Sequence, residues 1–258
     1  MADAPIIAAV RPLAPNHKFT QTEVDHLMAV AKSFAAREVK ATPVTAPALK
    51  TGLTNPSEFF RLAKSKDLLG TLVQSEVAGC NAILEACGAA AWPIGDTAYA
   101  LGTSFHETSG TMLPITEYGG INYFRRMYDI QGARPAKARE LGNVNPGDGA
   151  RFCGRGYVQL TGRRNYAKAG KALGVDLVGT PELALRPDIA AAVMVLGMRF
   201  GWFTGRYLDD DIPRDGPATL QQFIRSRDII NGTDKADKIA REAMAFQGAL
   251  QAGGWGPC

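Results

Sequence analysis

Hydrophobic residues recur at helical spacing through most of the chain after residue 56. Two stretches place them three or four positions apart, which predicts two helices with one apolar face each: Val77, Cys80, Ile83, Leu84 and Cys87, then Ala98, Leu101 and Phe105, the second helix ending before Gly110. The segment IAAAVMVLGM (189–198) is apolar throughout, which predicts a helix buried on every side. ADKIAREAMAFQGAL (236–250) predicts a closing amphipathic helix. Alternation typical of strands is confined to RGYVQLTG (155–162), so we expect a mainly α fold with at most a small β element.

The first 55 residues differ in pattern from the rest. Residues 1–17 are irregular and contain proline, residues 19–40 predict a helix with a capping box at Thr20 and Glu23, and residues 41–56 form a linker rich in Pro and Thr. Asn55 followed by Pro56 is typical of a capped helix start. We therefore divide the chain into an N-terminal arm, helix and linker (1–55) and a main domain (56–258).

The region from Glu117 to Ala150 is rich in Gly and Asn, with aromatic residues between them. This composition predicts long loops, and we expect them to line a cleft.

Composition is that of an ordinary soluble globular protein, with 46% hydrophobic and 21% charged residues and a net charge of +4. The charges are scattered, so the sequence favours no nucleic-acid partner but is compatible with weak attraction to an anionic polymer. The longest apolar run is half of the roughly 20 residues that span a membrane, so no stable membrane insertion is expected. The N-terminus lacks the basic region of a signal peptide.

Cysteine and histidine spacing points to neither a metal site nor a disulfide framework. Cys80 and Cys87 on one straight helix would lie about 10.5 Å apart along its axis, beyond the roughly 7 Å that a disulfide tolerates. We expect the thiols to be free and mostly buried, while a bridge between Cys153 and Cys258 stays open. The three histidines form no recognisable ligand cluster, so no metal is expected.

The candidate chemistry begins at FHETSGTMLPITE (105–117). Glu107 falls in the last turn of a predicted helix, where exposed carbonyl groups and nearby apolar residues both disfavour its ionised form. A glutamate that keeps its proton is what a general acid requires. The alternative is a solvated helix end without a function, which position alone favours. His106 precedes Thr-Ser-Gly rather than a zinc-protease motif, so it is a supporting or packed residue.

A second candidate segment is GRGYVQLTGRRNYAKAG (154–170). On an extended segment Gln159 and Thr161 share one face, where an amide and a hydroxyl suit a water molecule or a sugar hydroxyl. Tyr157 and Tyr166 are candidates for stacking on sugar rings. A Gly-rich connector without a function is an equal alternative.

Four motifs in one order make the pattern specific: FHETSGTMLPITEYG, GDGARFCGRGYVQLTGRRNY, GMRFGWFTGRYL and DIINGTDKA. Over about residues 57–250 they resemble glycoside hydrolase family 19, and most closely its bacteriophage and prophage endolysins. The resemblance implies a lysozyme-like, two-lobed helical domain that cuts β-1,4 bonds of N-acetylated aminosugar polymers by inversion, without a cofactor.

Carried over by position, the resemblance assigns roles to single residues. Glu107 becomes the general acid and Glu117, ten positions later, the second carboxylate, with Asp129 and Glu140 as rivals. Thr161 matches the residue that steers the attacking water. The expected substrate contacts are His106, Tyr157, Gln159, Asn165, Tyr166 and Asn231. GWFTG (201–205) is expected to be core first and cleft wall second.

The expected function is therefore that of an endolysin that hydrolyses bacterial peptidoglycan. It would wait as a monomer in the host cytoplasm and reach the cell wall through a holin-type pore. Two alternatives stay open: a chitinase acting on the N-acetylglucosamine polymer, and a catalytically inactive wall-binding virion protein.

Overall fold

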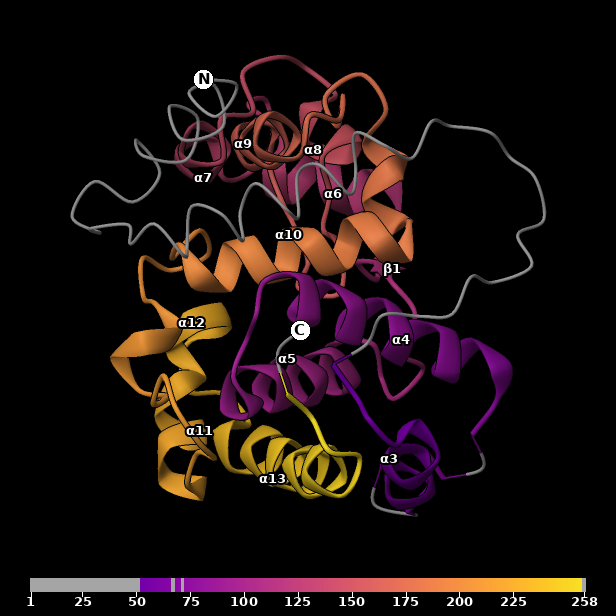
Figure 1. Ribbon diagram of the computed structural model, residues 1–258. Coiled ribbons are helices and arrows are strands. Elements are labelled where there is room, and N and C mark those ends of the chain that lie inside the picture. The colour runs from indigo at the N-terminus through magenta and orange to yellow at the C-terminus, as the bar shows by residue number, and fades with distance from the viewer. Residues whose placement is uncertain (1–51, 66–67, 71, 257–258) are drawn as a thin grey trace, which may run out of the picture.

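One buried helix, α10 (Pro187–Arg199), runs between two groups of helices in the computed structural model (Figure 1). The structure describes residues 52–65, 68–70 and 72–256. The predicted helix at 19–40 and nearly all of the linker lie outside the described residues, and the boundary at residue 55 stays a prediction.

The described chain is mostly helical with one small sheet, as predicted. On one side of α10 lie α3 (Pro56–Ala63), α4 (Gln74–Ala89), α5 (Ile94–Glu107), α11 (Leu220–Ser226), α12 (Asp228–Asn231) and α13 (Ala236–Ala252). On the other side lie α6 (Ile121–Tyr128), α7 (Pro135–Glu140), α8 (Asp148–Arg151) and α9 (Arg163–Leu173). Short 3-10 turns cover Pro181–Leu185 and Leu208–Asp210. Strands β1 (Ile115–Thr116) and β2 (Arg155–Gly156) pair antiparallel, with Ile115 opposite Gly156.

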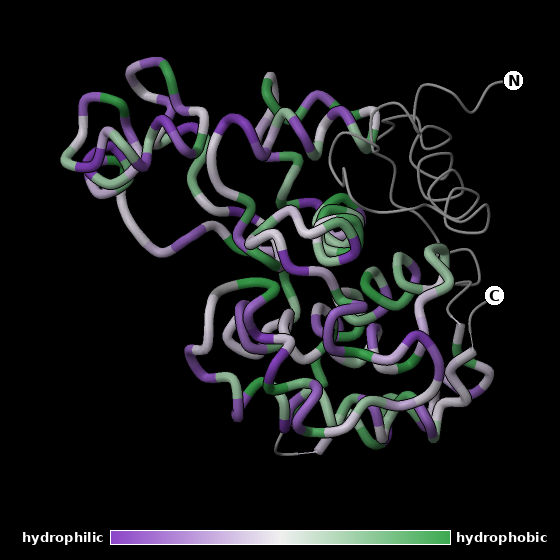
Figure 2. The backbone as a smooth tube through the Cα atoms, turned by 90° about the vertical axis from the view of Figure 1, so that its left-hand side faces the viewer, coloured by the Kyte–Doolittle hydropathy of each residue, from purple (hydrophilic) through white to green (hydrophobic). Residues whose placement is uncertain are grey.

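Helix α10 is apolar on every side because it belongs to two hydrophobic cores. Ala191, Met194 and Met198 pack into the core formed with α4, α5 and α13. Ile189, Val193 and Leu196 pack into a second core with α9. Figure 2 shows this helix near the centre of the molecule, where hydrophobic residues are concentrated. Among the described residues no helix combines the length and hydrophobicity that a membrane span requires.

Helix α5 is more deeply buried than its sequence predicts. Every residue from Gly95 to Ser104 is buried, not just the stripe that contains Ala98 and Leu101. The helix lies against α13 at Gly102, where an added Cβ would come within 2.7 Å of the backbone nitrogen of Ala243. A small residue is therefore required at this crossing.

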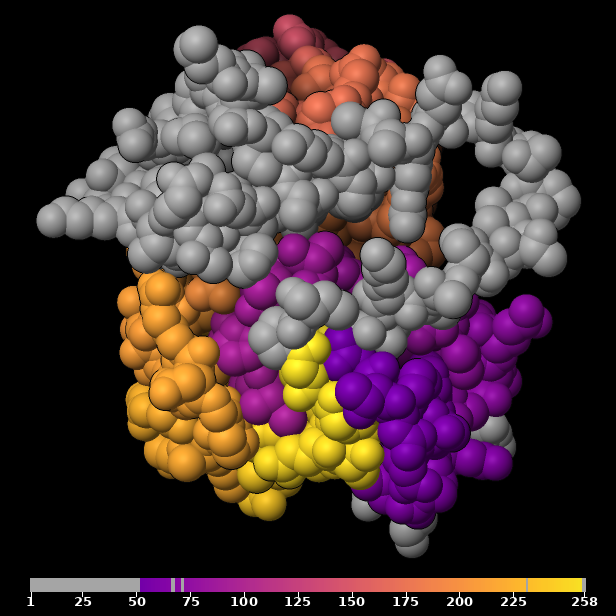
Figure 3. Space-filling view, in the orientation of Figure 1, coloured from indigo at the N-terminus to yellow at the C-terminus, as the bar shows by residue number. Residues whose placement is uncertain are grey.

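The two ends of the described chain meet. Asn55 caps α3 by accepting a hydrogen bond from the Glu58 N–H, and Pro56 begins the helix, both as predicted. Leu53, however, is buried and pairs with Trp255 in an isolated β-bridge, so residues 52–55 pack with the fold and not as a free linker. Figure 3 shows α3 (indigo) beside the C-terminal end of α13 (yellow).

Two local predictions are only partly correct. The expected long loops between 117 and 150 contain the short helices α6, α7 and α8. The expected strand at 155–162 is paired with β1 only at Arg155–Gly156, because the chain then turns back and Leu160 pairs with Arg155. Gln159 adopts a φ of +55° in this turn, a left-handed conformation that ends the extended segment.

Asp148 organises the loops around α8. Its Oδ2 accepts hydrogen bonds from the backbone N–H groups of Val144 and Asn145, and Arg163 Nε donates to it at 2.8 Å. Burial alone would raise the pKa of this carboxyl group, but the hydrogen bonds from Arg163 and the two backbone N–H groups hold the pKa below its usual range.

We expect Asp148→Asn to lower the free energy of unfolding at pH 7 by about 3 kcal/mol, because Arg163 loses its charged partner. The folded pKa of Asp148 lies below the unfolded value of about 3.9, so its contribution is fully present above that pH. It is lost as the pH falls through the folded value. Denaturant unfolding at pH 7 and at steps below pH 4 should therefore show the two proteins converging; a constant difference would contradict this account.

Candidate active site

The two glutamates of the first candidate segment line one pocket. Its volume is about 490 Å³, and Glu107, Glu117, Gln159, Thr161 and Asn165 all contribute to its wall. Glu107 comes from the end of α5 and Glu117 from the residue after β1, so the pocket lies between the two groups of helices. Five of the predicted site residues therefore share one cavity.

Glu107 ends α5, as predicted, but it has a cationic partner that the sequence did not reveal. Arg227 Nη1 donates a hydrogen bond to Glu107 Oε1 at 2.9 Å. The Arg227 side chain is 3% exposed and also donates from Nε to the Asp234 carbonyl group. The carboxyl group is thus fixed by the junction of α11 and α12, and not left at a solvated helix end.

Glu117 is held from both sides. Its backbone N–H donates to the Gly154 carbonyl at 2.8 Å, extending the pairing of β1 and β2 by one residue. Its Oε1 accepts from the Tyr128 hydroxyl at 2.7 Å, and its Oε2 from the Gly154 N–H at 3.3 Å. Burial, reinforced by the bond to Glu117, raises the pKa of Tyr128, which therefore remains a hydrogen-bond donor through the physiological range.

The rival carboxylates lie elsewhere. Asp129 is 4% exposed, accepts a hydrogen bond from the Gly147 N–H, and lines a different pocket. Glu140 is exposed on α7 and pairs with Lys137 Nζ at 2.8 Å. Neither lines the pocket that contains Glu107 and Glu117, so Glu117 remains the best candidate for the second carboxylate.

Gln159 and Thr161 form a polar shelf in the same pocket. Gln159 Nε2 donates to the Gly156 carbonyl at 3.3 Å, whereas its buried Oε1 has no hydrogen-bond partner among the described residues. Thr161 Oγ1 donates to the Gln159 carbonyl, and Asn165 Nδ2 donates to the Thr161 carbonyl, each at 2.8 Å. The shelf is anchored to backbone carbonyl groups and presents an unpaired amide oxygen.

The predicted stacking of Tyr157 and Tyr166 on sugars is wrong. Both side chains have 0% exposed surface and belong to the two hydrophobic cores. Arg155 Nη1 donates to the Tyr166 hydroxyl at 2.9 Å, and that hydroxyl donates to the Cys153 carbonyl at 2.8 Å. A ring without accessible surface cannot stack on a ligand, so both residues are part of the cores and not of the binding surface.

His106 also lies away from the pocket wall. Its Nδ1 is 3.6 Å from Glu242 Oε2, and its side chain is 11% exposed. Burial lowers the pKa of His106. The prediction that His106 contacts the substrate is therefore wrong, and the alternative prediction, a packed histidine, agrees with the structure. The Asn231 side chain lies outside what the structure describes, although Ile230 and Gly232 on either side of it line the pocket.

Several residues that line the pocket were not predicted from the sequence. Tyr128 and Lys137 come from α6 and α7, in the segment expected to be loop. Phe203 and Thr204 also line the pocket while Trp202 is buried, so GWFTG supplies both core and wall, as expected. The hydroxyl of Tyr128, eleven positions after Glu117, carried no local signal of its role.

None of the described cysteines lines this pocket. Cys80, Cys87 and Cys153 are free and buried, as predicted, and burial raises their pKa values. Cys258 lies outside the described residues. No group of three or more potential metal ligands occurs within the described part of the chain.

Comparison with known proteins identifies the family of the central part of the chain. Residues 81–205, which extend from α4 through α10 and include both glutamates, match the family model described as Chitinase class I. This part of the chain is a glycoside hydrolase family 19 domain.

Relatives of this family 19 domain align over short stretches. Chitinase 8 of Oryza sativa subsp. japonica is 52% identical over 40 residues, 16% of this chain and 15% of that protein. The acidic endochitinase of Petunia hybrida is 37% identical over 81 residues, 31% of this chain and 25% of that protein. The chain thus spans a quarter or less of the length of these two relatives.

The solved structures support the fold of the family 19 domain. Chitinase C from Streptomyces griseus HUT6037 superposes with a TM-score of 0.51 and 20% identity, over 86% of this chain and 84% of that one. The expected lysozyme-like helical fold is therefore confirmed.

Gly154 gives a test of the site geometry. An added Cβ would lie 2.8 Å from Gln159 Oε1 and 3.1 Å from Glu117 Oε2. We expect Gly154→Ala to displace both groups and lower the rate of glycoside hydrolysis at least tenfold. The loss of folding free energy should stay below about 2 kcal/mol, because side-chain ends can move.

The matched control is Gly248→Ala, since no atom of the described residues lies within 4 Å of a Cβ at that helical position. Turnover and thermal unfolding would be measured on both variants. Unchanged turnover in Gly154→Ala would show that the positions of Glu117 and Gln159 do not matter.

Proposed function

We propose that this protein is a glycosidase that hydrolyses β-1,4 bonds of bacterial peptidoglycan with inversion, as an endolysin does. The observation that carries the proposal is the single pocket lined by Glu107 and Glu117, which arrive from opposite groups of helices. An inverting hydrolase requires one acid and one base, about 6.5–9.5 Å apart, with room for a water between them. A polar shelf in the same pocket suits that water.

In this mechanism Glu107 gives a proton to the glycosidic oxygen as the bond to the anomeric carbon breaks. A water attacks that carbon from the opposite face, and Glu117 accepts the proton that the water releases. Thr161 and the unpaired Gln159 Oε1 orient the water. Arg227 binds Oε1 of Glu107 and stabilises the carboxylate left after transfer, while Oε2 receives no hydrogen bond from the described residues and is available to carry the proton.

Peptidoglycan is favoured by the resemblance of the four motifs to phage enzymes and by the net charge of +4, which suits an anionic wall. By the same resemblance, the enzyme would act as a monomer that a holin-type pore releases from the host cytoplasm. Chitin is the second candidate, because the two plant relatives are named as chitinases. An inactive wall-binding protein is less compatible with two carboxylates kept in one pocket.

We expect Glu107→Gln and Glu117→Gln to lower lysis of outer-membrane-permeabilised cells about 10²- to 10⁴-fold, since each removes a proton-transfer group. Clearing assays and mass spectrometry of digested sacculi would measure the loss and identify the bond. Glu140→Gln, at the exposed rival carboxylate outside the pocket, is the matched control and should keep full activity. A folded Glu107→Gln protein that still clears cells would refute the proposal.

A further inference from the structure

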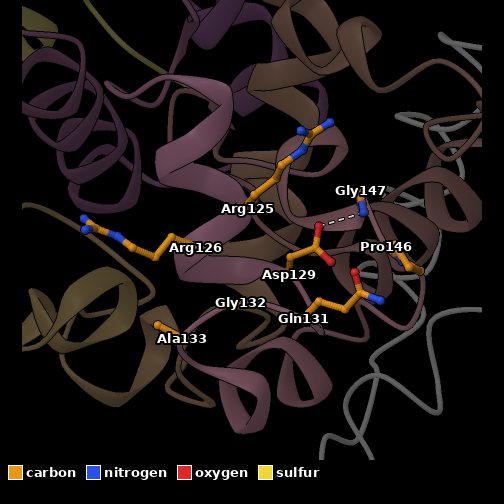
Figure 4. A pocket seen from close by; sticks show the side chains of 8 residues that line it. All are labelled: Arg125, Arg126, Asp129, Gln131, Gly132, Ala133, Pro146 and Gly147. Carbon is orange, nitrogen blue, oxygen red and sulfur yellow. Dashed lines mark hydrogen bonds between the residues drawn. The ribbon is translucent and has the colours of Figure 1, made fainter.

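A second pocket lies at the C-terminal end of α6. Its volume is about 590 Å³, and it is lined by Arg125, Arg126, Asp129 and the loops around Gly132 and Gly147. Figure 4 shows Asp129 at its centre, with its carboxylate bonded to the Gly147 N–H and the two arginines extending from the helix. None of these residues takes part in the mechanism above.

Asp129, which lines this pocket, has one carboxylate oxygen without a hydrogen-bond donor among the described residues. The residue is 4% exposed; its Oδ2 accepts from the Gly147 N–H at 2.7 Å, but its buried Oδ1 receives no hydrogen bond from any described residue. Burying a carboxylate oxygen without a donor costs free energy, so its natural partner is a group that carries N–H bonds. A primary amine or ammonium group meets that need and also matches the charge.

Arg125 and Arg126 favour an anionic ligand group, whereas Asp129 favours a cationic one. Both are exposed, and neither guanidinium group has a hydrogen bond or ion pair with the described residues, although Asp129 lies close in sequence. Figure 4 shows them pointing in different directions from the helix. A guanidinium group binds a carboxylate through two parallel hydrogen bonds. The pocket therefore offers one acceptor for an amine and two donors for carboxylates.

Consecutive residues at the end of α6 line this pocket and the candidate active site. Tyr128, which lines the catalytic pocket and binds Glu117, directly precedes Asp129, and consecutive Cα atoms are about 3.8 Å apart. A ligand for the second pocket is thus expected on the same polymer.

We propose that the pocket around Asp129 binds the peptide arm of peptidoglycan, with an amine of the peptide at Asp129 Oδ1 and its carboxylates at Arg125 and Arg126. This inference rests on the proposed function and makes it more specific. The peptide arms of peptidoglycan carry several carboxylates and, in many bacteria, a free side-chain amine. Chitin has neither, so the pocket would select wall polymer over chitin.

The first test is direct binding. The probe is the synthetic tripeptide L-Ala-γ-D-Glu-meso-diaminopimelate, titrated into the full chain and followed by calorimetry and by amide NMR shifts. Wild-type protein should bind, and the double variant Arg125→Gln, Arg126→Gln should bind at least tenfold more weakly. Arg241→Gln removes one exposed charge from α13, far from the pocket in sequence, and should bind as the wild type does.

Asp129→Asn tests the polarity of the buried atom. Its amide oxygen can keep the bond from the Gly147 N–H, which leaves an NH₂ donor where Oδ1 now accepts. Binding of the tripeptide should fall at least tenfold. A tripeptide whose diaminopimelate side-chain amine is acetylated should bind the wild type and Asp129→Asn with equal affinity. If Asp129→Asn unfolds, the Arg125→Gln, Arg126→Gln variant decides whether the pocket binds the tripeptide. Both arginine side chains are exposed, so their replacement should not disturb the fold.

The second test compares two polymers. Sacculi and the same glycan stripped of peptides by an amidase are digested, and the ratio of their kcat/KM values is measured. The wild type should favour the peptide-bearing polymer through a lower KM, and the ratio should fall toward one in the arginine and Asp129→Asn variants.

Failure of each idea has its own signature. Cleavage of sacculi with no tripeptide binding and an unchanged ratio in the variants would overturn the pocket while leaving the glycosidase. Tripeptide binding that depends on Asp129, in a protein that cleaves no glycan, would support the pocket and overturn the proposed function.

Discussion

The placement of the active site depends on one helix that must satisfy two hydrophobic cores at once. Helix α10 contributes Met194 to one core and Val193 to the other, so neither group of helices can turn about it without exposing apolar surface. Glu107 is carried by the first group and Glu117 by the segment joined to the second. The packing of α10 therefore sets the distance between the two carboxyl groups, although α10 supplies no residue to the pocket.

Glu107 and Glu117 are held in place by different kinds of interaction. Glu107 is fixed by a hydrogen bond from Arg227, whose side chain is 3% exposed, so removal of Glu107 would leave a buried guanidinium charge without its carboxyl partner. Glu117 is held by neutral donors, the Tyr128 hydroxyl and the Gly154 N–H. The first arrangement suits a carboxyl group that becomes charged, and the second leaves Glu117 at the wall of the pocket. This contrast is consistent with the acid and base roles that we propose for the two residues.

Local patterns predicted those parts of the fold that local physics determines. The apolar run at 189–198 predicted α10, the Asn55–Pro56 cap predicted the start of α3, and Gly110 marked the end of the α5 region. The HET and QLT motifs correctly predicted Glu107, Gln159 and Thr161 as residues of one pocket, but not the position of His106.

The remaining errors come from contacts distant in sequence or from backbone geometry. Arg227 lies 120 positions after Glu107, so no window of sequence could pair them. Tyr157 and Tyr166 were assigned to the surface because aromatic residues near a polar motif suit sugars, but their burial depends on how α9 and α10 pack. The φ of +55° at Gln159, unusual for a residue with a side chain, broke the strand that alternation predicted.

The meeting of the two ends of the described chain has a practical meaning for engineering. Gly256 donates a backbone hydrogen bond to the Gly52 carbonyl at 2.8 Å, so the polypeptide enters and leaves the domain at the same place. A domain of this kind can be inserted into a loop of a host protein with little separation of the host's own strands or helices. The two ends can also be joined by a short linker and new termini opened in an exposed loop, which would give a circular permutant with the pocket of Glu107 and Glu117 unchanged.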